Sequence, residues 1–112
     1  MNEYLLPFQN LDAYRVARQL AKEVHDSKIG DAELRDQATR AAKSAFLCLC
    51  EGLPNDGAAM RRKYFTEARN SLAETAGAVD LADAIGAIDA GRARSIQVLA
   101  NRLRRMLTAL LR

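Results

Sequence analysis

The chain of 112 residues has no tryptophan and only one histidine. Catalytic sets that pair a nucleophile with a base, and di-iron sites of the Glu-x-x-His type, need histidine at a fixed spacing from partners. His25 has no such partner, and we expect it at the surface near a helix end. The six glycines are scattered, so no glycine-rich phosphate loop is present. These absences indicate that the protein is not an enzyme.

Cysteine is also scarce, and the positions of the two cysteines predict neither a disulfide nor a metal site. Cys48 and Cys50 would point about 200° apart on a helix, which excludes a disulfide between them. One C-x-C run cannot supply the four ligands of a structural zinc site. We therefore expect buried free thiols and neither a metal nor another cofactor.

Long apolar runs are missing as well. No stretch of about 18 apolar residues occurs, so we expect no membrane-spanning helix. Met1 to Asn10 contain no basic region followed by an apolar core, as a secretory signal would. The expected location is the cytoplasm.

What the chain has is a helix-forming composition. Hydrophobic residues make up 49% of it and aromatic residues 5%, with two prolines. The length fits one domain spanning residues 1–112. The net charge of +3 is unevenly divided. Residues 1–57 carry seven Lys/Arg against nine Asp/Glu, a net of −2, and residues 58–112 carry ten against five, a net of +5. The basic half suggests an acidic partner or a solvated surface.

Apolar residues recur at helical spacing in four segments. We expect residues 1–10 to form an extended lead-in, because Pro7 blocks a helix there, with Phe8 packed on the bundle and Asn10 as an N-cap. The expected helices begin near residues 11, 31, 58 and 87–89, and they end before Gly30, near Gly52, near Ile85 and at the C-terminus. Short connections predict an all-α, antiparallel, up-down-up-down four-helix bundle.

Two helices show features beyond one core stripe. The helix over 31–52 has a wide apolar arc that includes Phe46 and Leu47, which predicts a contact with another subunit. In the helix over 58–85, Leu81 points away from the core face. Gly77 weakens that helix by up to about 1 kcal/mol, which suggests a close helix crossing at this point.

The turn Pro54-Asn55-Asp56-Gly57 predicts a helical hairpin. Residues whose numbers sum to about 114 or 115 then lie level. Three polar pairs result: Arg40 with Glu74, Ser44 with Ser71, and Glu51 with Tyr64. We interpret them as a structural polar network, because a buried charge must be paired. The alternative, a catalytic or metal site around Arg40, Glu51 and Glu74, is the less favoured one.

The last helix predicts a basic face. On a helical wheel, Arg94, Arg105 and Arg112 fall opposite the apolar stripe, with Arg102 beside them. A second basic set opens the third helix: Arg61, Arg62 and Lys63. Arginine binds phosphate through two parallel hydrogen bonds. The sequence therefore suggests RNA or DNA binding through these seven residues, although a solvated helix face is the simpler interpretation.

Three runs carry a family resemblance. Gln37, Arg40, Ala41, Ala42 and Ser44, followed by Glu51-Gly52, match Q-x-x-R-A-A-x-S…E-G. Tyr64-Phe65, Ala68, Ser71-Leu72 and Glu74 match F…A-x-x-S-L-x-E, and Phe8, Leu11, Tyr14 and Ala17 match the opening. These motifs resemble those of proteins encoded in intervening sequences of bacterial 23S ribosomal RNA genes, which are similar to the accessory variability determinant of diversity-generating retroelements. This chain lacks the proline and asparagine that members usually carry between Ser44 and Cys50.

The resemblance implies a four-helix bundle that assembles as a homopentamer. It also implies nucleic-acid binding through a basic surface. The alternative function is a protein scaffold or accessory factor, for example for a reverse transcriptase, that does not contact nucleic acid directly.

Overall fold

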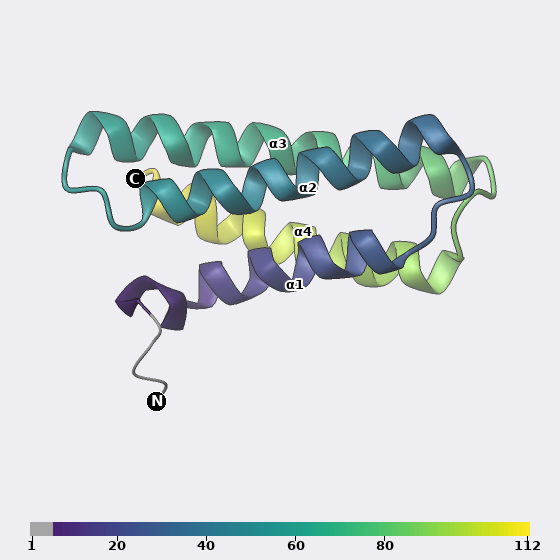
Figure 1. The fold of residues 1–112 in the computed structure, drawn as a ribbon, viewed down its shortest axis with the longest axis horizontal. Coiled ribbons are helices and arrows are strands. Elements are labelled where there is room, and N and C mark those ends of the chain that lie inside the picture. Colours follow the sequence, from purple (N-terminus) through teal and green to yellow (C-terminus); the bar gives the residue numbers. More distant parts are fainter. Residues whose placement is uncertain (1–5) are drawn as a thin grey trace.

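The computed structural model describes residues 6–112. A 3-10 helix, η1 (Pro7–Asn10), precedes four α-helices: α1 (Asp12–Asp26), α2 (Ala32–Gly52), α3 (Ala58–Ala84) and α4 (Ala90–Leu110). No strand occurs in this part of the chain. Successive helices run in opposite directions, and both η1 and the C-terminus lie at the end of the bundle that holds the α2–α3 turn (Figure 1). The predicted up-down-up-down four-helix bundle is confirmed.

Each helix packs on its neighbours in sequence, and α4 returns to pack on α1. The contact between α2 and α3 is the most extensive of these. One apolar cluster draws side chains from all four helices, and its largest fully buried members include Leu20, Leu49, Phe65 and Leu103. These residues lie on the apolar faces that helical spacing predicted, because burial of one stripe per helix is what the bundle requires.

Gly52 lets the α2–α3 pair close over its core. A Cβ atom built on Gly52 would lie 2.6 Å from Cε1 of Phe65 and 2.9 Å from its Cδ1. The bare backbone of α2 therefore faces the Phe65 ring directly. This is a close approach that only glycine permits.

Gly77 does not have the role that the sequence suggested. A Cβ atom there would meet nothing within 4 Å. The expectation of a close helix crossing at Gly77 is therefore wrong, since the residue lies on the exposed side of α3. Leu81 points away from the core as predicted and is exposed.

The helix ends follow local chemistry with one exception. The side chains of Asp31 and Asp89 accept hydrogen bonds from the third residue of their helices, as N-caps do. Gly86 ends the α3 region in a left-handed conformation, with φ of 73°. At the start of α1, however, Leu11 occupies the N-cap position that we assigned to Asn10.

The described part of the lead-in is helical, whereas an extended segment was expected. Residues 7–10 form η1 and are not extended, because proline is tolerated in the first turn of a helix. Residues 1–5 of the expected lead-in lie outside the described part of the chain. Phe8 packs on the bundle as predicted, with its ring 5.9 Å from that of Tyr14.

The two connections at the opposite end of the bundle are joined through their backbones. The amide of Gly30, between α1 and α2, donates to the carbonyl of Ala87, between α3 and α4, at 2.6 Å. Ile29 and Ile88 beside them are buried. Both hairpins of the bundle are therefore held together at this end.

Candidate nucleic-acid interface

The outer face of α4 is basic. Arg94, Arg102, Arg105 and Arg112 are all exposed, whereas Leu103 and Leu107 are buried. Beyond Asp89 the sequence contains no carboxylate side chain. The positive charge of this face therefore has no compensation from its own helix.

Arg61, at the start of α3, has a structural use. Its Nη1 donates to the carbonyl oxygens of Gly52, Leu53 and Asn55 at 3.2, 2.8 and 3.2 Å. Its guanidinium also lies 5.0 Å from the centre of the Phe65 ring. Arg61 thus caps the last carbonyls of α2, where a cation is favourable to the helix dipole. The cost of a cation at the N-terminus of α3 is offset by this contact with the end of α2.

Arg62 connects the two predicted basic sets. Its Nη1 donates to the carbonyl of Leu111 at 2.9 Å, so the start of α3 is joined to the end of α4. Arg61, Arg62 and Arg112 line one hollow of about 340 Å³, together with Asp56. Lys63 is exposed, with its ammonium group 5.7 Å from the centre of the Tyr64 ring.

Arg94 is separated from that group. It lines one hollow with Asp80 and Asp83 and a second with Glu23. Carboxylates near a guanidinium weaken its attraction for phosphate. The part of the basic face without such neighbours comprises Arg102 and Arg105, because Arg62 and Arg112 share their hollow with Asp56.

The predicted polar pairs differ in outcome. The hydroxyl oxygens of Ser44 and Ser71 lie 2.9 Å apart across the α2–α3 contact, as the turn position predicted. Hydrogen bonding to Glu51 and the charge of that carboxylate raise the pKa of Tyr64. The second pair is therefore also level, although Glu51 itself is exposed.

The third pair, Arg40 with Glu74, was predicted wrongly. Both side chains are exposed, so neither is a buried member of a polar network. Within residues 6–112 the ion pairs join Arg15 to Asp12 and Lys22 to Asp26. Water solvates exposed charges well, so an exposed pair gains little by forming.

The remaining reactive side chains do not assemble. Cys48 and Cys50 are half-buried free thiols, and burial raises the pKa of both. A raised pKa keeps a thiol protonated and unreactive. His25 is exposed in the last turn of α1, at the opposite end of the bundle from these cysteines (Figure 1). No cluster of three or more His, Cys, Asp or Glu that could hold a metal occurs in the described residues.

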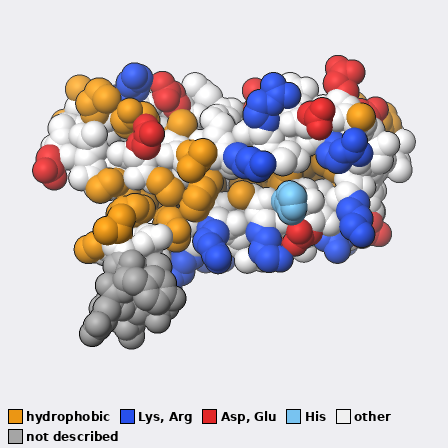
Figure 2. All heavy atoms as spheres, in the orientation of Figure 1, with side chains coloured by type: hydrophobic (Ala, Val, Ile, Leu, Met, Phe, Trp, Pro, Cys, Tyr) orange, Lys and Arg blue, Asp and Glu red, His pale blue; other side chains and the backbone are white. Residues whose placement is uncertain are grey.

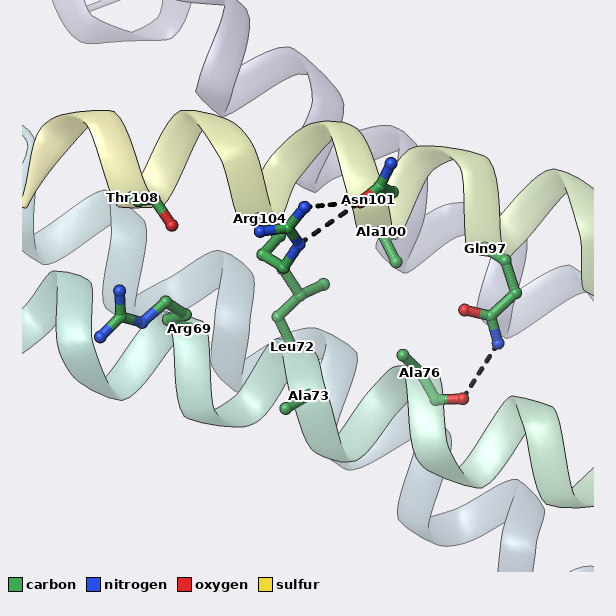
Figure 3. A pocket seen from close by; sticks show the side chains of 9 residues that line it. All are labelled: Arg69, Leu72, Ala73, Ala76, Gln97, Ala100, Asn101, Arg104 and Thr108. Atoms are coloured by element: carbon green, nitrogen blue, oxygen red, sulfur yellow. Dashed lines mark hydrogen bonds between the residues drawn. The ribbon is translucent and has the colours of Figure 1, made fainter.

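Arg69 and Arg104 were not singled out in the sequence analysis. They line a groove of about 400 Å³ between α3 and α4 (Figure 3). The hydrogen bond from the Gln97 side chain to the carbonyl of Ala76, at 3.0 Å, shows that residues whose numbers sum to 173 lie level in this hairpin, as Arg69 and Arg104 do. The sequence signal was Gly86, the helix stop between these two helices. Counting outward from that third turn would have found the pair.

An apolar patch lies at the end of the bundle that holds η1. Figure 2 shows apolar side chains gathered there, over the start of α1 and the end of α2. Leu6, Leu11 and Leu47 are 57%, 47% and 59% exposed, and the Phe46 ring packs 5.2 Å from that of Tyr14. We call Leu6, Leu11, Phe46 and Leu47 the apolar end patch. Farther along this face, basic and acidic side chains are mixed (Figure 2).

Comparison with known proteins adds one match. The family model described as 23S rRNA-intervening sequence protein matches residues 9–109, which include α1, α2 and α3 and all of α4 except its last residue. No curated protein matches the chain. None of the helices in the described residues is both long enough and apolar enough to span a bilayer.

Proposed function

The chain belongs to the 23S rRNA-intervening sequence protein family, and we propose that it is a non-enzymatic, self-assembling protein that binds RNA or DNA through its basic surface. The observation that carries this proposal is the outer face of α4. Its arginines are exposed, and no aspartate or glutamate follows Asp89 in the sequence. Such a surface attracts phosphate without reading bases.

The contact surface would centre on Arg102 and Arg105, with Arg112 and Arg62 at its end, where Asp56 lines the same hollow. Lys63 and Arg94 would be peripheral, the latter because Asp80 and Asp83 are its neighbours. Arg61 would stabilise this surface without being part of its contact face, since its guanidinium donates hydrogen bonds to carbonyl groups at the end of α2. Repetition of this surface in a ring of subunits would multiply its field.

A binding titration against salt tests the proposal. Fluorescence anisotropy with labelled single-stranded and double-stranded RNA and DNA should give a log affinity that falls steeply with log salt. Each phosphate contact contributes a slope of about −0.7 to −0.9. A flat slope, or no binding at low salt, would refute nucleic-acid binding by this surface.

Self-assembly is supported by the apolar end patch. Exposed apolar side chains that form a contiguous patch mark contact surfaces more often than isolated ones do. We propose that this patch packs against another copy of the chain in a homo-oligomer, with the pentamer as the expected size. Multi-angle light scattering should give an oligomer for the natural chain and smaller species for Leu47→Glu. A stable monomer of the natural chain would contradict assembly.

A second candidate function uses the same patch. The protein would be a scaffold or accessory factor for another protein, for example a reverse transcriptase, and it would not bind nucleic acid itself. Pull-down with and without nuclease separates the two functions. A partner that survives nuclease treatment and is lost in Leu47→Glu favours the scaffold. A partner that disappears with nuclease favours binding through RNA or DNA.

A further inference from the structure

The groove between α3 and α4 has an apolar floor. Leu72, Ala73 and Ala76 of α3 and Ala100 of α4 line it. Alanine side chains are too short to reach across a helix pair, so they leave the seam open on its outer side. The Gln97 side chain spans the seam at one end, where it bonds to the carbonyl of Ala76. The groove is thus limited at this end and remains about 400 Å³ in volume.

The walls of the groove carry positive charge and no negative charge. Arg69 rises from α3 and Arg104 from α4, on opposite sides (Figure 3). No aspartate or glutamate lines the groove. Neither arginine forms an ion pair with another described residue. Two cations therefore border an apolar floor without a counter-charge.

Arg104 is held in place by a neutral partner. Its Nε and Nη2 donate to Oδ1 of Asn101 at 3.3 and 3.0 Å (Figure 3). An amide oxygen orients the guanidinium without cancelling its charge. The Nη1 group of Arg104 has no hydrogen-bond acceptor among the described residues. Thr108, one turn farther along α4, adds a hydroxyl group to the Arg69 end of the groove.

We propose that this groove binds a small organic anion whose carboxylate or phosphate head is joined to a slim apolar body. The head would lie between Arg69 and Arg104, because guanidinium groups donate paired hydrogen bonds to such oxygens. The body would cover Leu72, Ala76 and Ala100, and the volume is in the range of small-molecule sites. The anionic head alone would contact only the two arginines, and the apolar body alone would contact only the floor of the groove. The arginines involved are not those of the proposed nucleic-acid surface, so the two proposals can fail separately.

Four probes separate the contributions of head and body. Phenyl phosphate and 4-phenylbutyrate carry both parts with different heads, inorganic phosphate is a head alone, and 4-phenylbutanol is an uncharged body. Amide chemical shifts of the isotopically labelled protein should move for both organic anions within residues 69–76 and 97–108. The two anions should compete for one site, since each has a charged head and an apolar body. 4-Phenylbutanol should bind at least about tenfold more weakly, the factor expected from one lost charge-assisted hydrogen bond. Inorganic phosphate should also bind at least about tenfold more weakly, because it leaves the apolar floor of the groove uncovered.

Three variants test the assignment of residues. Arg69→Gln and Arg104→Gln should each weaken phenyl phosphate binding about tenfold, since each removes a charged donor. Ala76→Leu should abolish binding with the charge unchanged, because the added side chain fills the floor. Arg18→Gln is the matched control, as Arg18 is exposed on α1 and does not line the groove. Far-ultraviolet circular dichroism verifies that each variant is folded.

Several results would overturn the proposal. One is that neither organic anion binds at concentrations up to about 10 mM, because a dissociation constant above this value is too weak for a binding site. Another is equal binding of inorganic phosphate or of 4-phenylbutanol, because the groove would then recognise only a head or only a body. Shifts confined to other residues, or an equal loss in Arg18→Gln, would place the binding elsewhere.

Discussion

The hydroxyl oxygens of Ser44 and Ser71 lie 2.9 Å apart across the contact between α2 and α3. The two side chains are small and half-buried, so the helices approach closely at this level. The pair also indicates the register of the α2–α3 hairpin, since Ser44 lies opposite Ser71 only when the chain turns at Pro54 to Gly57. Cys48, one turn along α2, donates to Glu67 at 3.9 Å in the same register.

This pair predicts a measurable coupling. Ser44→Ala and Ser71→Ala should each lower the free energy of unfolding by about 1 kcal/mol, because the remaining hydroxyl loses its partner. The double variant should cost little more than either single change. Urea unfolding followed by circular dichroism gives the three values for a double-mutant cycle. Strictly additive losses would show that the hydrogen bond contributes nothing.

Gly52→Ala should destabilise the bundle by about 1–3 kcal/mol, the usual cost of overpacking a core. The new methyl group would overlap the Phe65 ring, which is fully buried and cannot move aside easily. Thermal and urea unfolding measure the loss. Gly52→Ala combined with Phe65→Leu should recover part of it, since the smaller side chain makes room. Wild-type stability in Gly52→Ala would contradict the close approach.

Gly77→Ala should have the opposite effect. A methyl group there meets nothing within 4 Å, and alanine favours a helix interior over glycine. We expect a gain of about 0.5–1 kcal/mol in the free energy of unfolding. The same unfolding assays apply, and this change is the matched counterpart of Gly52→Ala. A loss of stability would restore the close crossing that the sequence suggested.

Substitutions of Arg105 and Arg61 should affect different properties, the first nucleic-acid binding and the second the free energy of unfolding. Arg105→Gln should reduce the steepness of the salt dependence of nucleic-acid binding by about one unit, with unfolding unchanged. Arg61→Gln should instead lower stability by about 1–2 kcal/mol, because carbonyl groups at the end of α2 lose their donor. Anisotropy titrations and urea unfolding of both variants provide the comparison. An unchanged slope in Arg105→Gln would count against the α4 surface.

The Tyr64 hydroxyl should titrate above the ordinary tyrosine pKa because of Glu51. The folded protein then keeps this proton at a pH where the unfolded chain has lost it. Stability should therefore fall as the pH rises through the ordinary value of about 10. Ultraviolet titration in a Tyr4→Phe, Tyr14→Phe background isolates the group. Glu51→Gln should lower the measured pKa, and an unchanged value would argue against the contact.

Much of the fold could be predicted because the signals are local. Turn residues at 54–57 and apolar residues at helical spacing determine where α2 and α3 begin and end, and Ser44 and Ser71 follow from counting around the turn. Two residues that lie at the same height along the hairpin need not both be buried, however. Arg40 and Glu74 are both exposed, although they were counted from the same turn as Ser44 and Ser71. Gly77 was misjudged for a related reason, since a glycine marks either a close contact or an open surface.

The candidate site was only partly predictable. Helical spacing placed Arg102 and Arg105 on the outside of α4 correctly, whereas Arg112 is exposed but lies beyond the end of α4 at Leu110. It could not show that Arg61 caps α2, because that contact depends on the path of the chain through residues 52–55. Nor could one helix considered alone reveal the groove, since Arg69 and Arg104 come from different helices.

The hydrogen bond from Gly30 to Ala87 makes the two ends of the bundle unequal as places to modify the chain. An inserted tag or domain at residues 29–31 or 86–88 would separate paired backbones and uncover Ile29 and Ile88. The exposed turn around Asp56 has no such backbone-to-backbone bond to the other hairpin within the described residues, and the start of α1 and the end of α4 lie at that same end (Figure 1). Fusions and circular permutants should therefore be built there, with new chain openings near Asp56 and a linker that joins the segment before α1 to the end of α4.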